Sequence, residues 1–447
     1  DRHQRRAALS AAGSLVIRNC DALIDGVVVS GQDIHVVAGV ITVIGPTSAQ
    51  SLTGDVDAAG LMAMPGFINS HTHAAMTLLR GAVEDVAVES WFNDHIWPIE
   101  VNVTADDVQL GTELACAEMI QAGVTSFADH YFHADRAAAA VINSGLRANL
   151  GMTFFSSQGP AGLETSASFA ADWNDAAGGR ITTSLAPHAT YTCDDADLSS
   201  AAEAARTLGV RVHLHAAETV EQTESSLAAR GITPIQVLAD TGVLDAGVLI
   251  AHGCGIVPDD LALLAPFADR IGVAHCPKTY MKLATNPLTP IDELRSAGIA
   301  VGLGTDGPAS CNSIDLFENM RLTALAQKFI HRDATRLGVS QALAMAGPES
   351  ARAIGSSAGR LAVGAPADII LVDLSGLHCQ PLHNPLAALV YSARASDVQT
   401  TIVDGIPLMV DRELLTVDAA ELSARVAARA PQLLDHDPTQ SIQTYAP

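Results

Sequence analysis

The middle of the chain alternates between short apolar runs of strand length and longer segments with a helical pattern. A strand, a helix and another strand in succession favour parallel pairing, because parallel neighbours need a long crossover connection. Eight such units predict a TIM-like (β/α)8 barrel. A doubly wound sheet is the alternative, but it usually has fewer strands, and no G-x-G-x-x-G loop follows the first run. The eight runs cover residues 64–73, 125–131, 147–155, 181–188, 211–218, 248–255, 271–277 and 300–307.

Outside this region the pattern changes. Residues 14–61 contain short β-branched runs broken by Gly, Asp and Asn, and a similar pattern returns after Gly359. The segment 418–430 is rich in alanine and is expected to be a helix. The first six residues have no periodicity and are expected to be a tail. Within the barrel region, Thr104 and Asp107 resemble a capping box that begins a helix.

Composition limits the partners of such a chain. Of its 447 residues, 48% are hydrophobic and 17% are charged, which is typical of a globular enzyme. The 49 acidic and 25 basic residues give a formal charge of −24, which repels nucleic acid and anionic membrane surfaces. Seven scattered cysteines without C-x-x-C spacing indicate free thiols. No apolar run approaches the roughly 20 residues of a spanning helix, so we expect a cytoplasmic protein with no membrane partner.

The first apolar run ends in two histidines separated by one residue, His71 and His73. Side chains along a strand alternate between its faces, so these two imidazoles point the same way. Two neighbouring imidazoles are suitable ligands for one zinc, iron or nickel ion. An exposed strand end with two polar residues is the alternative interpretation, and the apolar run with Pro65 and Gly66 before the pair disfavours it.

Other polar residues also lie where the predicted strands end. His215 and Glu218 end the fifth run, His252 ends the sixth, and Asp306 ends the eighth. Because barrel active sites are built at the carboxyl ends of the strands, these side chains are expected to meet. A core histidine is the alternative for His252, and a turn residue before glycine is the alternative for Asp306. His213 shares a strand face with His215 and is an alternative third imidazole.

The segment 65–73, Pro-Gly-Phe-Ile-Asn-Ser-His-Thr-His, resembles the first metal motif of the amidohydrolase superfamily. The resemblance is to its branch of purine, pyrimidine and triazine deaminases and chlorohydrolases, and further matches recur in order along nearly the whole chain. It implies that the two ends of the chain pair into one small discontinuous β-sandwich domain. In that division, residues 1–61 and 359–447 form the sandwich and the terminal helix, and residues 62–358 form the barrel.

The resemblance also implies a ligand set for one metal ion. His215 is then the third imidazole after His71 and His73, and Asp306 is the last ligand. Three imidazoles, one carboxylate and a water make an open catalytic site rather than a closed structural one. No lysine ends the fourth run, so the bridging lysine of two-metal relatives is missing. We therefore expect one divalent ion, with Zn2+ preferred and Fe2+ as the alternative.

Catalytic roles follow from the same resemblance. Water activated by the metal is expected to attack a ring carbon that carries an amino group, and Asp306 takes its proton. Glu218 protonates the adjacent ring nitrogen, and His252 stabilises the developing oxyanion before ammonia departs. Many relatives have a second histidine three residues after His252, where this chain has Gly255.

Residues 89–100 resemble the loop after the first strand in methylthioadenosine/S-adenosylhomocysteine deaminases. There the residue that matches Trp91 covers the base, and the one that matches Glu100 binds the two ribose hydroxyls. Residues 187–192 resemble a P-H-A-P-Y-T motif, which makes His188 a substrate contact. A helix with an apolar face and solvated acids is the alternative interpretation of residues 89–100. At the seventh strand the usual Asn, Ser and Asn of the motif are replaced by Cys276, Thr279 and Tyr280.

These observations predict a hydrolytic deaminase that releases ammonia from a purine nucleoside such as 5′-methylthioadenosine, S-adenosylhomocysteine or adenosine. The alternatives are a deaminase of a free base or pterin, such as guanine or a cytosine-like ring, and a triazine amino- or chlorohydrolase. A non-catalytic binding protein on the same scaffold is a third class. We expect a small-molecule substrate and a homo-oligomer, either a dimer or a tetramer.

Overall fold

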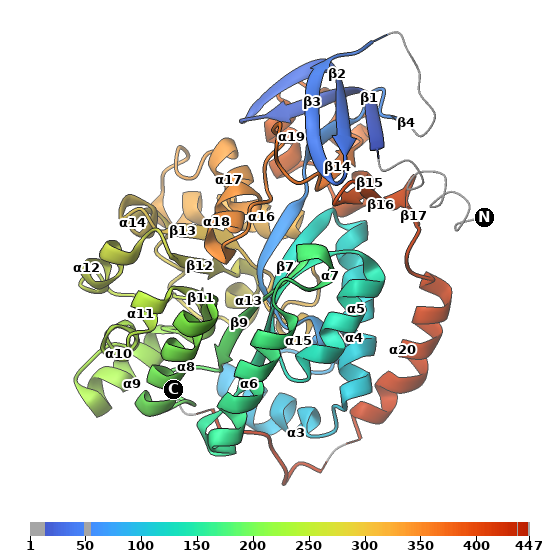
Figure 1. Ribbon diagram of the computed structural model, residues 1–447. Coiled ribbons are helices and arrows are strands. Elements are labelled where there is room, and N and C mark those ends of the chain that lie inside the picture. Colours follow the sequence, from blue (N-terminus) through green and yellow to red (C-terminus); the bar gives the residue numbers. More distant parts are fainter. Residues whose placement is uncertain (1–13, 49–54, 436, 446–447) are drawn as a thin grey trace.

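The computed structural model describes residues 14–48, 55–435 and 437–445, so the expected N-terminal tail lies outside the described residues. Eight strands form one parallel sheet that curves into a barrel, and strands that follow one another in sequence are neighbours in the sheet (Figure 1). The predicted barrel is confirmed. Its strands are β6 (Phe67–Thr72), β7 (Val124–Tyr131), β8 (Arg147–Phe154), β9 (Ile181–Pro187), β10 (Arg211–Ala216), β11 (Val248–His252), β12 (Ile271–His275) and β13 (Ala300–Leu303).

The last strand of the barrel lies beside the first. Beyond β13, the backbone N–H groups of Thr305 and Asp306 both donate to the carbonyl oxygen of His71, at 3.1 and 3.0 Å. β11 and β12 are buried along their whole length, as expected for parallel strands covered on both faces. The closing contact therefore joins two residues that were predicted to share a site.

Helices cover the outside of the barrel (Figure 1). The first long one begins as expected, because the Thr104 hydroxyl accepts from the Asp107 N–H and the Asp107 carboxylate accepts from the Thr104 N–H. The longer helices are α4 (Ala105–Gln121), α5 (Ala134–Ser144), α6 (Pro160–Trp173), α8 (Asp195–Leu208), α9 (Val220–Arg230), α10 (Pro234–Asp240), α16 (Leu316–His331), α17 (Val339–Ala346) and α18 (Pro348–Ile354). Further helical segments are η1 (Ala74–Leu79), α7 (Ala176–Gly179), α11 (Val243–Ala246), α12 (Asp260–Leu264), α13 (Pro277–Lys282), α14 (Ile291–Ser296), α15 (Pro308–Cys311) and α19 (Pro385–Tyr391).

A second sheet combines strands from both ends of the chain, which confirms that the ends pair. β14 from the C-terminal part pairs antiparallel with β5, and β5 pairs parallel with β1 from the N-terminal part. Buried aliphatic side chains of both parts form the core of this sheet. Its strands are β1 (Ser14–Ile24), β2 (Val27–Val37), β3 (Val40–Pro46), β4 (Asp55–Asp57), β5 (Met62–Pro65), β14 (Ile369–Val372), β15 (Val398–Val403), β16 (Ile406–Val410) and β17 (Glu413–Leu414).

The expected single strand over residues 64–73 is two strands that belong to different sheets. β5 ends at Pro65 in the small sheet, and β6 begins at Phe67 in the barrel. A Cβ atom on the intervening Gly66 would lie 2.2 Å from the side chain of Thr125, so only glycine fits this close crossing. The domain division at residues 61 and 62 stays a prediction.

The expected C-terminal helix is present as α20 (Ala419–Leu433) and packs on α4. Arg429 forms a paired ionic contact with Asp107, at 2.6 and 2.9 Å, which ties the helix to the capping box. All seven cysteines are free and buried. In the part of the chain that the structure describes, no helix has the length and apolar character needed to cross a bilayer.

Candidate active site

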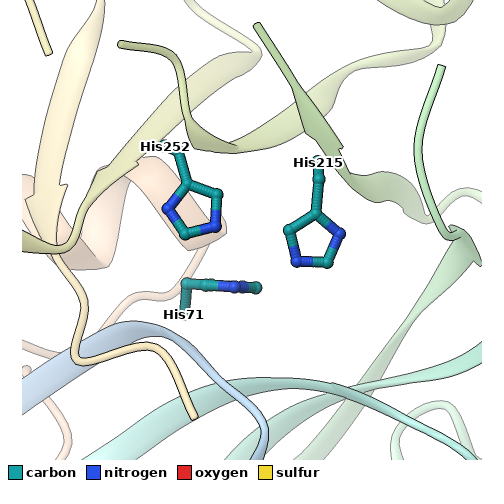
Figure 2. A group of neighbouring side chains, drawn as sticks. All are labelled: His71, His215 and His252. Carbon is teal, nitrogen blue, oxygen red and sulfur yellow. The ribbon is translucent and has the colours of Figure 1, made fainter. Parts of the chain in front are cut away.

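Histidines from three strands converge at the carboxyl end of the barrel. His71 from β6, His215 from β10 and His252 from β11 are buried, and their rings face a common space (Figure 2). One ring nitrogen from each lies within 4.8 Å of the others. His73 lies just past β6 beside them, with its Nε2 atom 3.3 Å from that of His215.

Asp306, just beyond the last barrel strand β13, completes this cluster at the same carboxyl end of the barrel. Its Oδ1 atom lies 3.6 Å from Nε2 of His71 and 3.3 Å from Nε2 of His73. Its Oδ2 atom accepts a hydrogen bond of 2.7 Å from the Ser310 hydroxyl, which leaves Oδ1 directed at the imidazoles. Burial raises the pKa of Asp306, but the favourable interactions of its carboxylate with the imidazoles of His71 and His73 outweigh burial and hold the pKa well below its usual range. The structure thus brings the four predicted ligands together: three imidazoles and the ionised carboxylate of Asp306.

The outer nitrogens of two of these imidazoles are held by backbone carbonyls. Nδ1 of His73 donates to the carbonyl of His130 at 2.6 Å, and Nδ1 of His215 donates to the carbonyl of His188 at 2.8 Å. Since a carbonyl only accepts, each Nδ1 carries a proton, so in the neutral form of either ring the lone pair lies on Nε2. Metal-binding histidines commonly donate their other ring N–H to a backbone carbonyl in this way.

His71 supports the same conclusion. Its Nδ1 atom lies 2.9 Å from Nε2 of His213, whereas its own Nε2 atom is buried and has no hydrogen-bond partner. An unpaired buried nitrogen is costly and calls for an explanation. Three imidazole nitrogens and one carboxylate oxygen that face one space fit a divalent zinc or iron ion. Such an ion would satisfy the Nε2 atom of His71.

His213 lies behind His71 rather than beside His215, so its ring supports a member of the cluster. His130 was not singled out from the sequence, although it lies near the end of β7. Its ring and those of His73 and His215 form another possible three-ligand group. Its Nδ1 atom pairs with the Thr153 hydroxyl at 2.9 Å. The position of His130 near a strand end was the only sequence signal, because no motif surrounds it.

Glu218 lies at the edge of the cluster, just beyond β10. Its Oε1 atom is 3.9 Å from Nε2 of His252, and its Oε2 atom accepts a 3.5 Å hydrogen bond from the Tyr191 hydroxyl. Burial, aided by the negative charge of Asp306, raises the pKa of Glu218 to about 7. A carboxyl group with a pKa near neutrality can both give and take a proton at physiological pH. Burial lowers the pKa of His252 to about 3, so its ring is neutral.

The strand ends at this site have an unusual backbone. His252 and Asp306 both adopt left-handed conformations, with φ of 73° and 64°. Non-glycine residues rarely adopt such angles, and the strain is usually retained where function requires it. Here the turn lets each strand end direct its side chain into the common space.

The side chains of His73, His215, His252 and Asp306 line a partly enclosed cavity. All three expected substrate contacts, Trp91, Glu100 and His188, line it together with Glu218 and Asp306. Trp91 begins a π-helical turn, η2 (Trp91–Ile96), between α2 (Val88–Ser90) and α3 (Trp97–Glu100). Residues 91–100 thus form helical turns over the barrel mouth. The further aromatic residues of the wall are Phe92, Trp97, Tyr131, Phe132, Phe155 and Tyr191.

Glu100 is buried in this wall, where the Tyr131 hydroxyl donates to its Oε1 atom at 2.5 Å. Burial raises the pKa of Glu100 to about 7, although the bond from Tyr131 opposes the rise. His188 is held through its Nδ1 atom by the Thr192 hydroxyl at 2.9 Å. Both side chains therefore have fixed positions from which to contact a ligand.

Of the three residues that depart from the usual motif, Thr279 alone lines the cavity. Its hydroxyl lies 3.2 Å from that of Ser310, which in turn holds Asp306. Cys276 and Tyr280 pack with Cys254 in a small buried cluster, and the Tyr280 hydroxyl accepts from the Cys276 N–H. Cys276 and Tyr280 therefore differ from the usual motif without lining the cavity.

The (β/α)8 barrel and the His and Asp cluster at its carboxyl end are together typical of metal-dependent hydrolases. The family model described as "Amidohydrolase family" matches residues 62–407. This chain belongs to the amidohydrolase family. Its predicted resemblance and its class as a hydrolase of carbon–nitrogen bonds are therefore confirmed.

Comparison with individual proteins gives long matches. A protein of Pelotomaculum thermopropionicum named 5-methylthioadenosine/S-adenosylhomocysteine deaminase is 42% identical over 385 residues, which cover 86% of this chain and 88% of that protein. A 5′-deoxyadenosine deaminase of Methanosarcina mazei is 40% identical over 400 residues, or 89% and 92% of the two chains. The crystal structure of an adenosine deaminase from Xanthomonas campestris with bound zinc superposes with a TM-score of 0.86 at 32% identity, over 94% and 98% of the chains.

Proposed function

We propose that this protein is a metal-dependent hydrolytic deaminase of purine nucleosides related to adenosine. It replaces the amino group of the purine ring with the oxygen of water and releases ammonia. The observation that carries the proposal is that a single aromatic cavity holds both the His and Asp cluster with Glu218 and the separate buried carboxyl of Glu100. The names of the relatives from Pelotomaculum and Methanosarcina support a nucleoside substrate.

His71, His73, His215 and Asp306 would hold one divalent ion. Zinc is the first choice, since the Xanthomonas relative has zinc bound, and ferrous iron is the alternative. When bound, the ion would supply the Lewis acidity that makes a water molecule a nucleophile at neutral pH. The donor atoms are suited to it because the neutral rings of His73 and His215 carry their lone pairs on Nε2 and the Nε2 atom of His71 has no other partner.

The proton transfers are assigned to three side chains. Asp306, with Oδ2 fixed by Ser310, takes a proton from the attacking water. Glu218, whose pKa of about 7 keeps a large protonated fraction, gives its proton to the ring nitrogen next to the attacked carbon. Neutral His252 lies 3.9 Å from Glu218 and donates a hydrogen bond to the attacking oxygen. The proton on Asp306 then passes to the amino group, the carbon–nitrogen bond breaks to release ammonia, and the proton left on the added oxygen returns to Glu218 as the ring carbonyl forms.

Binding residues lie around the same cavity. The aromatic wall that includes Trp91 and Phe155 provides flat apolar surfaces for the base. The two carboxyl oxygens of Glu100 can accept from two adjacent ribose hydroxyls, and His188 lines the same cavity as a further substrate contact. A free base, a pterin or a triazine has no diol, so it would not use Glu100. Assembly into a dimer or tetramer and a cytoplasmic location stay predictions.

A screen of ammonia release tests the proposal. Zinc-loaded protein is incubated with adenosine, 5′-deoxyadenosine, 5′-methylthioadenosine, S-adenosylhomocysteine, adenine, guanine, cytosine, a pterin and an aminotriazine. We expect the nucleosides to have at least about tenfold higher kcat/KM than the free bases, because the hydrogen bonds to Glu100 are lost without ribose. Protein stripped of metal by a chelator is the control. Turnover confined to a free base or a triazine would overturn the proposal.

A further inference from the structure

The chain returns to the mouth of the barrel after its last helix. Beyond α20, residues 437–445, here called the C-terminal strap, run past α3 on the side of the barrel away from the small sheet (Figure 1). The Asn102 side chain donates to the carbonyl of Asp435 at 3.1 Å and directs the chain along this path. The strap therefore approaches the same end of the barrel as the candidate site.

Tyr445 is fastened at the end of the strap by one amide side chain. Its N–H donates to Oδ1 of Asn93 at 2.7 Å, and its carbonyl accepts from Nδ2 of Asn93 at 3.0 Å. Tyr445 is only 4% exposed, although it is near the end of the chain. Asn93 lies two residues from Trp91 in η2, so the strap is attached to the helical turn that forms the aromatic wall.

The ring of Tyr445 packs behind that wall on two sides. It stacks on Phe92 with a centroid distance of 4.7 Å and an angle of 13°, and it meets the edge of Tyr191 at 5.6 Å. Phe92 and Tyr191 both line the catalytic cavity, and the Tyr191 hydroxyl donates to Glu218. Tyr445 thus supports Phe92 in the wall and Tyr191, which is the hydrogen-bond partner of Glu218.

The middle of the strap borders a second cavity of about 600 Å3 that opens to solvent. Ser441 and Ile442 line one side of it. The two cavities share Glu100, and they also share Phe132, Thr153 and Phe155. A nucleoside whose ribose reaches Glu100 from the catalytic cavity is therefore placed to direct its 5′ group into the second one.

This second cavity has no fixed positive charge. Among the described residues that line it, Glu100 and His133 are the titratable side chains, and neither Lys nor Arg is present. The homocysteine group of S-adenosylhomocysteine carries an ammonium and a carboxylate, and its carboxylate would find no cationic partner among these residues. An uncharged substituent needs no cationic partner, so the lack of Lys and Arg would not weaken its binding.

We propose that the C-terminal strap is part of the active site: Tyr445 is a positioning residue for Phe92 and Tyr191, and Ser441 and Ile442 border the space that receives an uncharged group on the 5′ carbon of the nucleoside. The inference rests on the proposed function, because that function places the ribose at Glu100. It predicts a preference for 5′-deoxyadenosine and 5′-methylthioadenosine over S-adenosylhomocysteine.

The first experiment compares Tyr445→Ala, Tyr445→Phe and the control Gln440→Ala, an exposed position of the same strap. Zinc content, thermal midpoint, KM and kcat are measured for zinc-loaded protein with 5′-methylthioadenosine. The loss of two aromatic contacts in Tyr445→Ala is expected to raise KM about 5- to 30-fold with unchanged zinc content. Tyr445→Phe keeps both ring contacts and should restore KM to within about threefold of the parent. An unchanged KM in Tyr445→Ala, or a loss that Tyr445→Phe does not rescue, would overturn the positioning role.

The second experiment supplies the missing cation. Ser441→Arg is compared with Ser441→Gln, a neutral side chain that also fills space, through the ratio of kcat/KM for S-adenosylhomocysteine to that for 5′-methylthioadenosine. We expect Arg to raise this ratio about 3- to 10-fold and Gln to leave it unchanged. Equal ratios in both variants, or a parent that prefers S-adenosylhomocysteine, would overturn the assignment of the second cavity. A parent enzyme that deaminates none of the nucleosides would instead overturn the proposed function and this inference with it.

Discussion

The Nδ1 atom of His71 lies 2.9 Å from the Nε2 atom of His213, although the two residues are 142 positions apart in the chain. The contact orients the His71 ring so that its buried Nε2 atom faces Asp306 at 3.6 Å. His213, which the sequence left as an alternative metal ligand, therefore supports the proposed ligand His71. This relationship leads to the first prediction.

His213→Ala should weaken zinc binding about 10- to 100-fold, because the hydrogen-bond partner of a metal-bound histidine fixes the orientation and basicity of its ring. The measurement is the zinc dissociation constant from competition with a chromogenic chelator. The exposed His383, changed to Gln, is the control. Zinc affinity equal to the parent in His213→Ala would show that the ring of His71 is held in place without its partner.

Asp306→Asn and Glu218→Gln should both remove most turnover, by roughly 10²- to 10⁴-fold, but should differ in metal content. Asp306 faces the imidazoles at 3.3 and 3.6 Å, whereas the contacts of Glu218 are with His252 and Tyr191. Metal analysis after dialysis should show loss in the first variant and nearly full occupancy in the second. If Glu218→Gln turned over like the parent, its role as proton donor would be wrong.

Glu100→Ala should lower kcat/KM for a nucleoside about 10- to 150-fold, because a charged acceptor contributes roughly 1.5 to 3 kcal/mol through its hydrogen bonds. The matching 2′,3′-dideoxynucleoside has no diol and should lose little from the same change. Steady-state kinetics of both substrates on both proteins give the comparison. Equal losses on the two substrates would make Glu100 a structural residue.

Glu100 should also make stability depend on pH. Burial raises its pKa from the ordinary value of 4.5 to about 7, so between these values the folded protein holds a proton that the unfolded chain has lost. Stability from this group is full below pH 4.5 and is lost as the pH rises through about 7, with a ceiling of about 3 kcal/mol.

Metal-free parent and Glu100→Gln protein should therefore melt at temperatures that diverge with pH. The amide stays neutral, so the variant should gain roughly 2 to 3 °C on the parent between pH 5 and pH 8. Differential scanning calorimetry at the two pH values measures this. A constant difference between the melting temperatures would mean that Glu100 is ionised in the folded protein throughout this range.

Much of the fold was predictable because its determinants are local. The alternation of strand and helix patterns implies parallel strands, and parallel strands place their carboxyl ends on one side. For that reason His71, His215, His252 and Asp306 could be expected to meet before any distance was known. The capping box at Thr104 was predictable for the same reason, since its partners are three residues apart.

The remaining features depend on contacts between segments far apart in the sequence, which no local pattern encodes. Only the packing of β10 against the cluster shows that His213 supports His71, and only the crossing beside Thr125 shows that the chain changes sheets at Gly66. The contact between Tyr445 and Asn93 spans 352 positions. The sequence alone therefore determined the barrel and the residues at its mouth, through periodicity and strand direction. Tertiary packing decided which nitrogen atoms remain free and which distant segment completes the cavity wall, because both depend on how side chains fill a shared volume.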